Sequence, residues 1–123
     1  MSDTKDSLLV NRLKSVGWAS KGALILLRTE ASIKIQFAVA ILVTIAGFYF
    51  DISTTEWLFQ VAMIGLVMSI EGLNTAIEHI ADFVHPELHA SIGLIKDVAA
   101  GAVFFAAIAA IIVAAIIYYP KLF

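Results

Sequence analysis

The sequence predicts an all-α membrane protein, with an N-terminal amphipathic surface helix and three transmembrane helices in a single domain over residues 1–123. Two observations lead to this prediction. The chain is 61% hydrophobic and 15% charged, with a mean hydropathy of +0.95, whereas a soluble domain carries about 25% charged residues. Its apolar residues also fall into three runs long enough to cross a hydrocarbon core of about 30 Å. The chain has no cysteine, which excludes a disulfide framework and a thiol nucleophile.

The amphipathic helix is predicted over residues 7–28, with Asp6 or Ser7 as its N-cap. Basic residues recur at seven-residue intervals along one side of this segment, at Lys14, Lys21 and Arg28. Apolar residues occupy another side, and this combination is typical of a helix that lies in the membrane interface. The alternative is a soluble helix packed on the rest of the protein, but the chain offers little soluble protein to pack on.

The predicted transmembrane helices cover residues 33–50, 57–83 and 94–119. A polar turn at residues 51–56 separates the first from the second. Pro86 interrupts the chain between the second and the third, and Pro120 is expected to end the third. Alanines at four-residue spacing on the third helix form a ridge of small residues, at Ala102, Ala106, Ala110 and Ala114. Because such ridges let helices approach closely and three spans make a thin bundle, we expect a homo-oligomer.

The distribution of cations predicts the orientation in the membrane. Six cations precede or open the first span: Lys5, Arg12, Lys14, Lys21, Arg28 and Lys34. The turn at residues 51–56 carries two acids and no cation, so the positive-inside rule places the N-terminus in the cytoplasm and this turn outside. In this topology five ionisable residues meet at the cytoplasmic boundary: Glu30, Glu78, Asp82, Lys96 and Asp97.

A stripe of polar residues ends the second predicted span. Its members are Glu71, Asn74, Thr75, Glu78 and Asp82. Their spacing places them on one face of a helix. An ionised side chain near the bilayer centre costs about 2.5–3.5 kcal/mol on insertion scales, and such residues mark functional sites. The stripe is therefore the first candidate for a site.

The stripe and its neighbours fit an enzyme that phosphorylates a lipid with ATP. Mg²⁺ is usually held by one or two carboxylates together with substrate phosphates, and Glu30 and Glu78 can supply these carboxylates. Lys96 can contact a phosphate, and Arg12 is a further candidate for the nucleotide. Glu71 lies at the depth of a lipid hydroxyl, where it can act as a general base. The sequence has neither a Walker pattern nor a glycine-rich phosphate loop, which excludes a soluble-type kinase fold.

Two alternative functions of the polar stripe belong to other classes of protein. Acidic residues in spans can mark an ion path, but the outer half of every predicted span lacks ionisable groups. The polar stripe can also join helices in a non-catalytic oligomer. His85 and His89 flank Pro86 and could bind a metal, but no third ligand has a fitting spacing, so we interpret them as loop or interface residues.

The chain resembles the bacterial integral-membrane diacylglycerol kinase family, which includes undecaprenol kinases. The resemblance rests first on the stretch Glu71-Gly72-Leu73-Asn74-Thr75-Ala76-Ile77-Glu78. Three further blocks match in the same order: the surface helix from Arg12 to Gly22, the entrance Arg28-Thr29-Glu30, and the opening Lys96-Asp97-Val98-Ala99-Ala100-Gly101-Ala102. The run Ala99-Ala100-Gly101 and the ending Pro120-Lys121 are more similar to the undecaprenol kinase branch.

The resemblance implies a homotrimer with active sites shared between neighbouring subunits in the bacterial inner (cytoplasmic) membrane. It implies transfer of phosphate from MgATP to a lipid hydroxyl, converting diacylglycerol to phosphatidic acid or, alternatively, undecaprenol to undecaprenyl phosphate. No nucleic-acid partner is expected. By position, the family's roles fall on Glu71 as general base, Glu30 and Glu78 as metal ligands, Asn74 as the residue that orients the site, Arg12, Lys96 and Asp97 on the nucleotide side, and Asp82 at the cytoplasmic rim.

Overall fold

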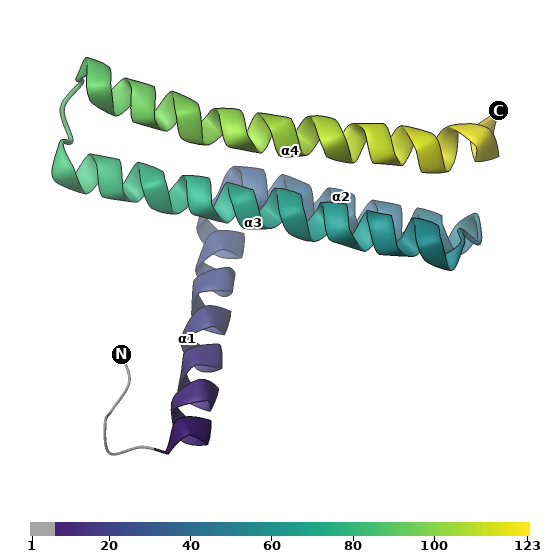
Figure 1. Ribbon diagram of the computed structural model, residues 1–123, viewed down its shortest axis with the longest axis horizontal. Helices are drawn as coiled ribbons and strands as arrows, with labels where there is room; N and C mark the ends of the chain where they lie inside the picture. The colour runs from purple at the N-terminus through teal and green to yellow at the C-terminus, as the bar shows by residue number, and fades with distance from the viewer. Residues whose placement is uncertain (1–6) are drawn as a thin grey trace.

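The computed structural model describes residues 7–123, and in this range the chain forms four α-helices and no strand. The helices are α1 (Leu8–Thr29), α2 (Ala31–Tyr49), α3 (Thr54–Val84) and α4 (Ala90–Leu122). Figure 1 shows α2, α3 and α4 side by side as an elongated bundle, from which α1 projects crosswise. α2, α3 and α4 are each long and apolar enough to cross a membrane. The predicted all-α fold with three spans is confirmed.

The first two helices meet at a single residue. Ser7 caps α1, because its side chain accepts a hydrogen bond from the backbone N–H of Val10 at 3.3 Å; the alternative cap, Asp6, lies outside the described residues. Glu30 ends α1 in an extended conformation, with φ −102° and ψ 115°. Its N–H donates to the carbonyl of Leu26 (3.0 Å) and its carbonyl accepts from Lys34 (3.1 Å). The chain therefore changes direction sharply at Glu30, which belongs to the ends of both helices.

A tight turn joins α2 to α3 at the opposite end of the bundle. Ser53 and Glu56 form a capping box, in which each side chain accepts a hydrogen bond from the other residue's backbone N–H. Gly47 allows close packing here, since a Cβ at this position would lie 2.6 Å from the ring of Trp57. The capping box explains why α3 begins at Thr54, three residues before the predicted start.

The last helix corrects one prediction. Pro120 does not end α4, which continues to Leu122. A proline removes only its own backbone hydrogen bond, and Phe123 N–H still donates to the carbonyl of Tyr119 (3.1 Å). α4 also begins four residues before the predicted start, because the Nδ1 atom of His89 accepts a hydrogen bond from the backbone N–H of Ser91 at 3.0 Å.

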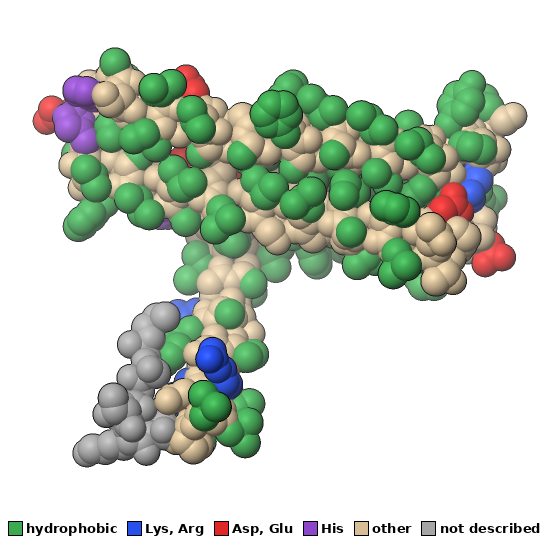
Figure 2. Space-filling model, in the orientation of Figure 1, with side chains coloured by type: hydrophobic (Ala, Val, Ile, Leu, Met, Phe, Trp, Pro, Cys, Tyr) green, Lys and Arg blue, Asp and Glu red, His purple; other side chains and the backbone are tan. Residues whose placement is uncertain are grey.

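α3 is the central helix. It packs against α4 along much of its length and, less extensively, against α2. The buried polar side chains of residues 7–123 all belong to it: Gln60, Glu71, Asn74 and Thr75. Most large apolar side chains of the bundle are exposed, and Figure 2 shows them covering the visible face between charged ends. This apolar exterior suits contact with lipid or with further copies of the chain.

Candidate active site where α1 meets α3

The polar stripe of α3 forms one connected face. Glu71, Asn74 and Thr75 are each at least nine-tenths buried, and Glu78 is half-buried. The Nδ2 atom of Asn74 donates a hydrogen bond to Oε1 of Glu78 at 3.2 Å. The Oδ1 atom of Asn74 is buried without a partner among the described residues. Asn74 thus orients one carboxylate and has an unused acceptor beside it.

The last turn of α1 packs on α3 beside this stripe. The Cδ1 atom of Leu26 lies over Gly72, 3.1 Å from the position that a Cβ would take there. One turn later, Oε1 of Glu30 lies 3.9 Å from Nε2 of His79. Gly72 and His79 directly follow Glu71 and Glu78 in the sequence. Glu30 therefore reaches α3 on the flank of the stripe, close to the turn that carries Glu78.

The junction with α1 also gives the depth of the site. α3 runs 18 residues from Thr54 to Gly72, or about 27 Å at 1.5 Å per residue, which is close to the thickness of a hydrocarbon core. α1 meets the bundle near Gly72 and projects crosswise from it (Figure 1). If α1 lies in the interface, Glu71 is at the membrane surface and the last turns of α3 extend into water.

The residues that the sequence analysis expects on the nucleotide side fall into two groups. Nζ of Lys96 on α4 and Oδ1 of Asp82 on α3 form an ion pair of 2.6 Å, and Asp97 beside it is exposed. Arg12 lies elsewhere, 18 residues before Glu30 and thus about 27 Å away along α1. Because α1 projects away from the bundle, one chain does not bring Arg12 to the other site residues.

The donor set fits a hard cation that also binds phosphate. Among residues 7–123 no group of three or more His, Asp or Glu side chains is arranged to hold a metal. Mg²⁺ needs only one or two carboxylates when substrate phosphates and water complete its ligands. The rings of His85 and His89 are 5.1 Å apart, and the Nδ1 atom of each lies within hydrogen-bond distance of a backbone group two residues further along the chain.

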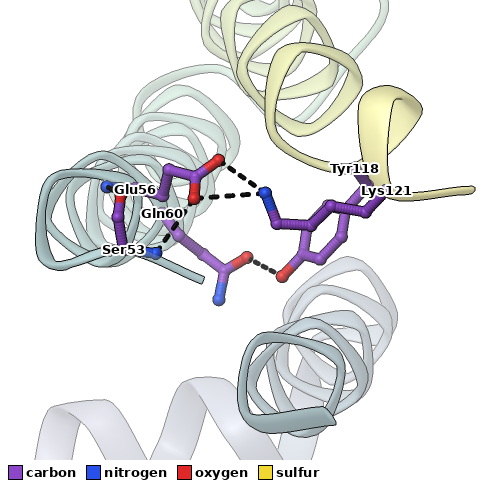
Figure 3. A network of polar contacts seen from close by, with 5 residues as sticks. All are labelled: Ser53, Glu56, Gln60, Tyr118 and Lys121. Carbon is purple, nitrogen blue, oxygen red and sulfur yellow. Dashed lines mark hydrogen bonds and ion pairs between the residues drawn. The ribbon is translucent and has the colours of Figure 1, made fainter. Parts of the chain in front are cut away.

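A second polar cluster, which we call the outer network, lies at the other end of the bundle (Figure 3). It consists of Ser53, Glu56, Gln60, Tyr118 and Lys121. Nζ of Lys121 contacts both carboxylate oxygens of Glu56, at 3.0 and 3.2 Å. The hydroxyl of Tyr118 lies within hydrogen-bond distance of Oε1 of Gln60, whose Nε2 donates to the carbonyl of Val43 at 3.0 Å. This network joins α2, α3 and α4, and the sequence signal for it is a lone Gln60 one turn after Glu56.

The fold defines a small multi-pass membrane protein with a cluster of carboxylates towards the α1 end of its bundle. The sequence model of the family described as "Prokaryotic diacylglycerol kinase" matches residues 17–118. An undecaprenol kinase of Bacillus subtilis (strain 168) is 38% identical over 98% of this chain and 99% of its own length. A diacylglycerol kinase of Escherichia coli (strain K12) is 29% identical over 81% of this chain and 82% of its own length. The chain belongs to the prokaryotic diacylglycerol kinase family, and the family and its relatives indicate a lipid kinase.

Proposed function

We propose that this chain transfers the γ-phosphoryl group of ATP to the hydroxyl of a polyprenol such as undecaprenol. The observation that carries this choice is the match to an undecaprenol kinase along essentially the full length of both chains. Diacylglycerol is the second candidate, because the family model and the Escherichia coli relative carry that name. The order reverses the sequence-based expectation, which placed diacylglycerol first. Both lipids present a primary hydroxyl at the membrane surface.

In the proposed mechanism Glu71 is the general base. Its carboxylate accepts the proton of the lipid hydroxyl, the hydroxyl oxygen forms a bond to the γ-phosphorus, and the bond from that phosphorus to the β–γ bridging oxygen breaks to release ADP. The burial of Glu71 and its position at the α1 junction support this role. The hydroxyl of a membrane lipid stays near the bilayer, and a general base must lie within hydrogen-bond reach of it. The remaining task of the protein is positioning and compensation of charge.

The other site residues serve the nucleotide. Glu30 and Glu78 are proposed to hold Mg²⁺, which when bound neutralises charge on the phosphates. The unpartnered Oδ1 of Asn74 beside Glu78 supports a polar ligand at this place. Lys96 is proposed to contact a phosphate, with Asp82 holding it in place between nucleotides and Asp97 organising the nucleotide.

We further propose a homotrimer in the bacterial cytoplasmic membrane, with the N-terminus in the cytoplasm. The cations of α1 support this orientation. The exposed apolar faces of α2 and α4 support contact with further copies. Arg12, about 27 Å from Glu30 along α1, is then available to the site of a neighbouring copy.

The test is ATP-dependent phosphate transfer by the purified protein in mixed micelles. Undecaprenol and diacylglycerol are offered separately, with Glu71→Gln as the matched control. We expect transfer to undecaprenol at a higher kcat/KM than to diacylglycerol, and loss of transfer to both in Glu71→Gln with unchanged oligomeric mass. Transfer to neither lipid by a folded wild-type protein refutes the proposal, and Glu71→Gln with wild-type turnover refutes the role of the base.

A further inference from the structure

Gly72 is the one glycine in the polar half of α3 that touches another helix. A Cβ built on it would lie 3.1 Å from the Cδ1 atom of Leu26, which is closer than ordinary van der Waals contact. Gly65 on the same helix has no atom within 4 Å of the corresponding position. The two glycines therefore differ in one respect: only at Gly72 does the missing side chain let the end of α1 rest on the backbone of α3.

The contact at Gly72 is mechanically linked to Glu30. Leu26 and Glu30 are one turn apart on α1, and the N–H of Glu30 donates to the carbonyl of Leu26 at 3.0 Å. Residues with this spacing share one face of a helix. α1 ends at Glu30, so the carboxylate is fixed to the turn that carries Leu26. A displacement of that turn would move Glu30 by a similar amount.

Two points of contact hold this turn on α3. Leu26 packs on Gly72, and Glu30 lies 3.9 Å from His79, two turns further along the same side of α3. The contact with His79 is weak, because its side chain is 74% exposed and the distance is long for an ion pair. Of these two contacts the apolar one of Leu26 with Gly72 is the stronger, and it acts together with the bond from Lys34 N–H that fixes the backbone of Glu30 to the first turn of α2.

We propose that Gly72 is a positioning residue for Glu30. By letting Leu26 sit directly on α3, it sets the distance between the carboxylate of Glu30 and the turn of α3 that carries Glu78. This inference rests on the proposed role of those two carboxylates in holding Mg²⁺. Mg²⁺ accepts little distortion of its octahedral ligands, so a shift of a few tenths of an ångström affects binding of the metal before it affects the fold.

A purely structural role for Gly72 has a different consequence. Replacement of a helix-interior glycine by alanine raises the intrinsic helix propensity. Gly72→Ala and Gly65→Ala share this gain, and only Gly72→Ala meets Leu26. If Gly72 served only packing, its replacement would change stability and leave the metal requirement as it is. The metal requirement therefore separates the two roles.

The experiment compares three variants of the full chain in mixed micelles: Gly72→Ala, the control Gly65→Ala, and the relief variant Gly72→Ala/Leu26→Val. The Mg²⁺ concentration for half-maximal phosphate transfer is measured first. Binding of Mn²⁺ is then measured by electron paramagnetic resonance with a non-hydrolysable ATP analogue, which needs no turnover. We expect Gly72→Ala to raise both the Mg²⁺ concentration for half-maximal transfer and the dissociation constant for Mn²⁺ by about threefold to tenfold. The kcat at saturating metal should stay within about twofold of wild type, because the ligand is displaced but intact.

The controls decide the inference. Gly65→Ala should match the wild type, and the relief variant should return to within about twofold of it, because the shorter side chain of Leu26→Val frees the space that the new Cβ needs and keeps an apolar contact with α3. The inference is overturned if Gly72→Ala keeps wild-type metal dependence, if Gly65→Ala shows the same shift, or if the relief variant keeps the defect. Glu30→Gln separates failure of this inference from failure of the proposed function. If Glu30→Gln raises the Mg²⁺ requirement and Gly72→Ala does not, only the positioning role of Gly72 is refuted.

Discussion

Removal of the Tyr118 hydroxyl tests what the outer network contributes. In the wild type this hydroxyl donates to Oε1 of Gln60, and the Gln60 side chain belongs to a residue that is only 5% exposed. Tyr118→Phe removes the donor and keeps the ring, which packs on Phe50 with centroids 6.0 Å apart. The same hydroxyl lies 3.0 Å from the carbonyl of Val43, so the change removes one donor that two acceptors on neighbouring helices share.

The magnitude follows from the burial of the acceptor. Interhelical hydrogen bonds between membrane spans contribute about 0.6 kcal/mol on average and at most about 1.7 kcal/mol. A buried acceptor left without a donor costs about 1–3 kcal/mol. Since the carbonyl of Val43 keeps its bond from Nε2 of Gln60, only one acceptor is orphaned. We expect Tyr118→Phe to lower the free energy of unfolding by about 1–2 kcal/mol.

The assay is reversible unfolding in mixed micelles, with turnover of the folded protein measured in parallel. Tyr119→Phe is the matched control, because Tyr119 is 65% exposed and should change stability by less than about 0.5 kcal/mol. Tyr118 lies 22 residues from Lys96 along α4, or about 33 Å, so kcat should stay within about twofold of wild type. Unchanged stability, or a large fall in kcat without a change in stability, would refute the reasoning.

Three further predictions concern the site and the turn. Glu78→Gln should raise the Mg²⁺ concentration for half-maximal rate by about tenfold or more, because one anionic ligand is lost; an unchanged value with loss of oligomer would favour the structural alternative. Asp82→Asn should change stability by less than about 1 kcal/mol, since its ion pair with Lys96 is exposed. It should also lower the KM for ATP by up to about fivefold, because Lys96 is then free to contact a phosphate. A higher KM would contradict this. Gly47→Ala should destabilise the protein by about 1–3 kcal/mol and shift the fluorescence of Trp57, because the new Cβ meets its ring; an unshifted spectrum would show that the ring moves freely.

The fold was largely predictable because its signals are local. Three apolar runs and one amphipathic segment define four helices, and the polar stripe is visible from its spacing alone. The ends of the helices were less predictable. The expectation that Pro120 ends the last helix was wrong. α4 loses the backbone hydrogen bond that Pro120 cannot donate, and it still continues to Leu122.

The residues proposed for the site could be grouped from the sequence, but their contacts could not be predicted. Spacing places Glu71, Asn74 and Glu78 on one face, and the structure adds the hydrogen bond between the last two. The contact of Leu26 with Gly72 could not be predicted from spacing, because it depends on the angle at which α1 meets α3. The outer network was missed for a similar reason: Gln60 and Tyr118 are 58 residues apart, and only the packing of α4 on α3 brings them together.

The two polar ends of α3 differ in how completely their polar groups are hydrogen-bonded. In the outer network, Lys121 pairs with Glu56, and the Gln60 and Tyr118 side chains bond to each other and to the carbonyl of Val43, so three helices are tied together. At the α1 end, Asn74 keeps a buried oxygen without a partner, and the ion pair that joins α3 to α4 is exposed to solvent. Native proteins pair nearly all buried polar groups unless a ligand uses them. This contrast supports the proposal that substrates bind at the α1 end of α3, whereas the outer network contributes to stability.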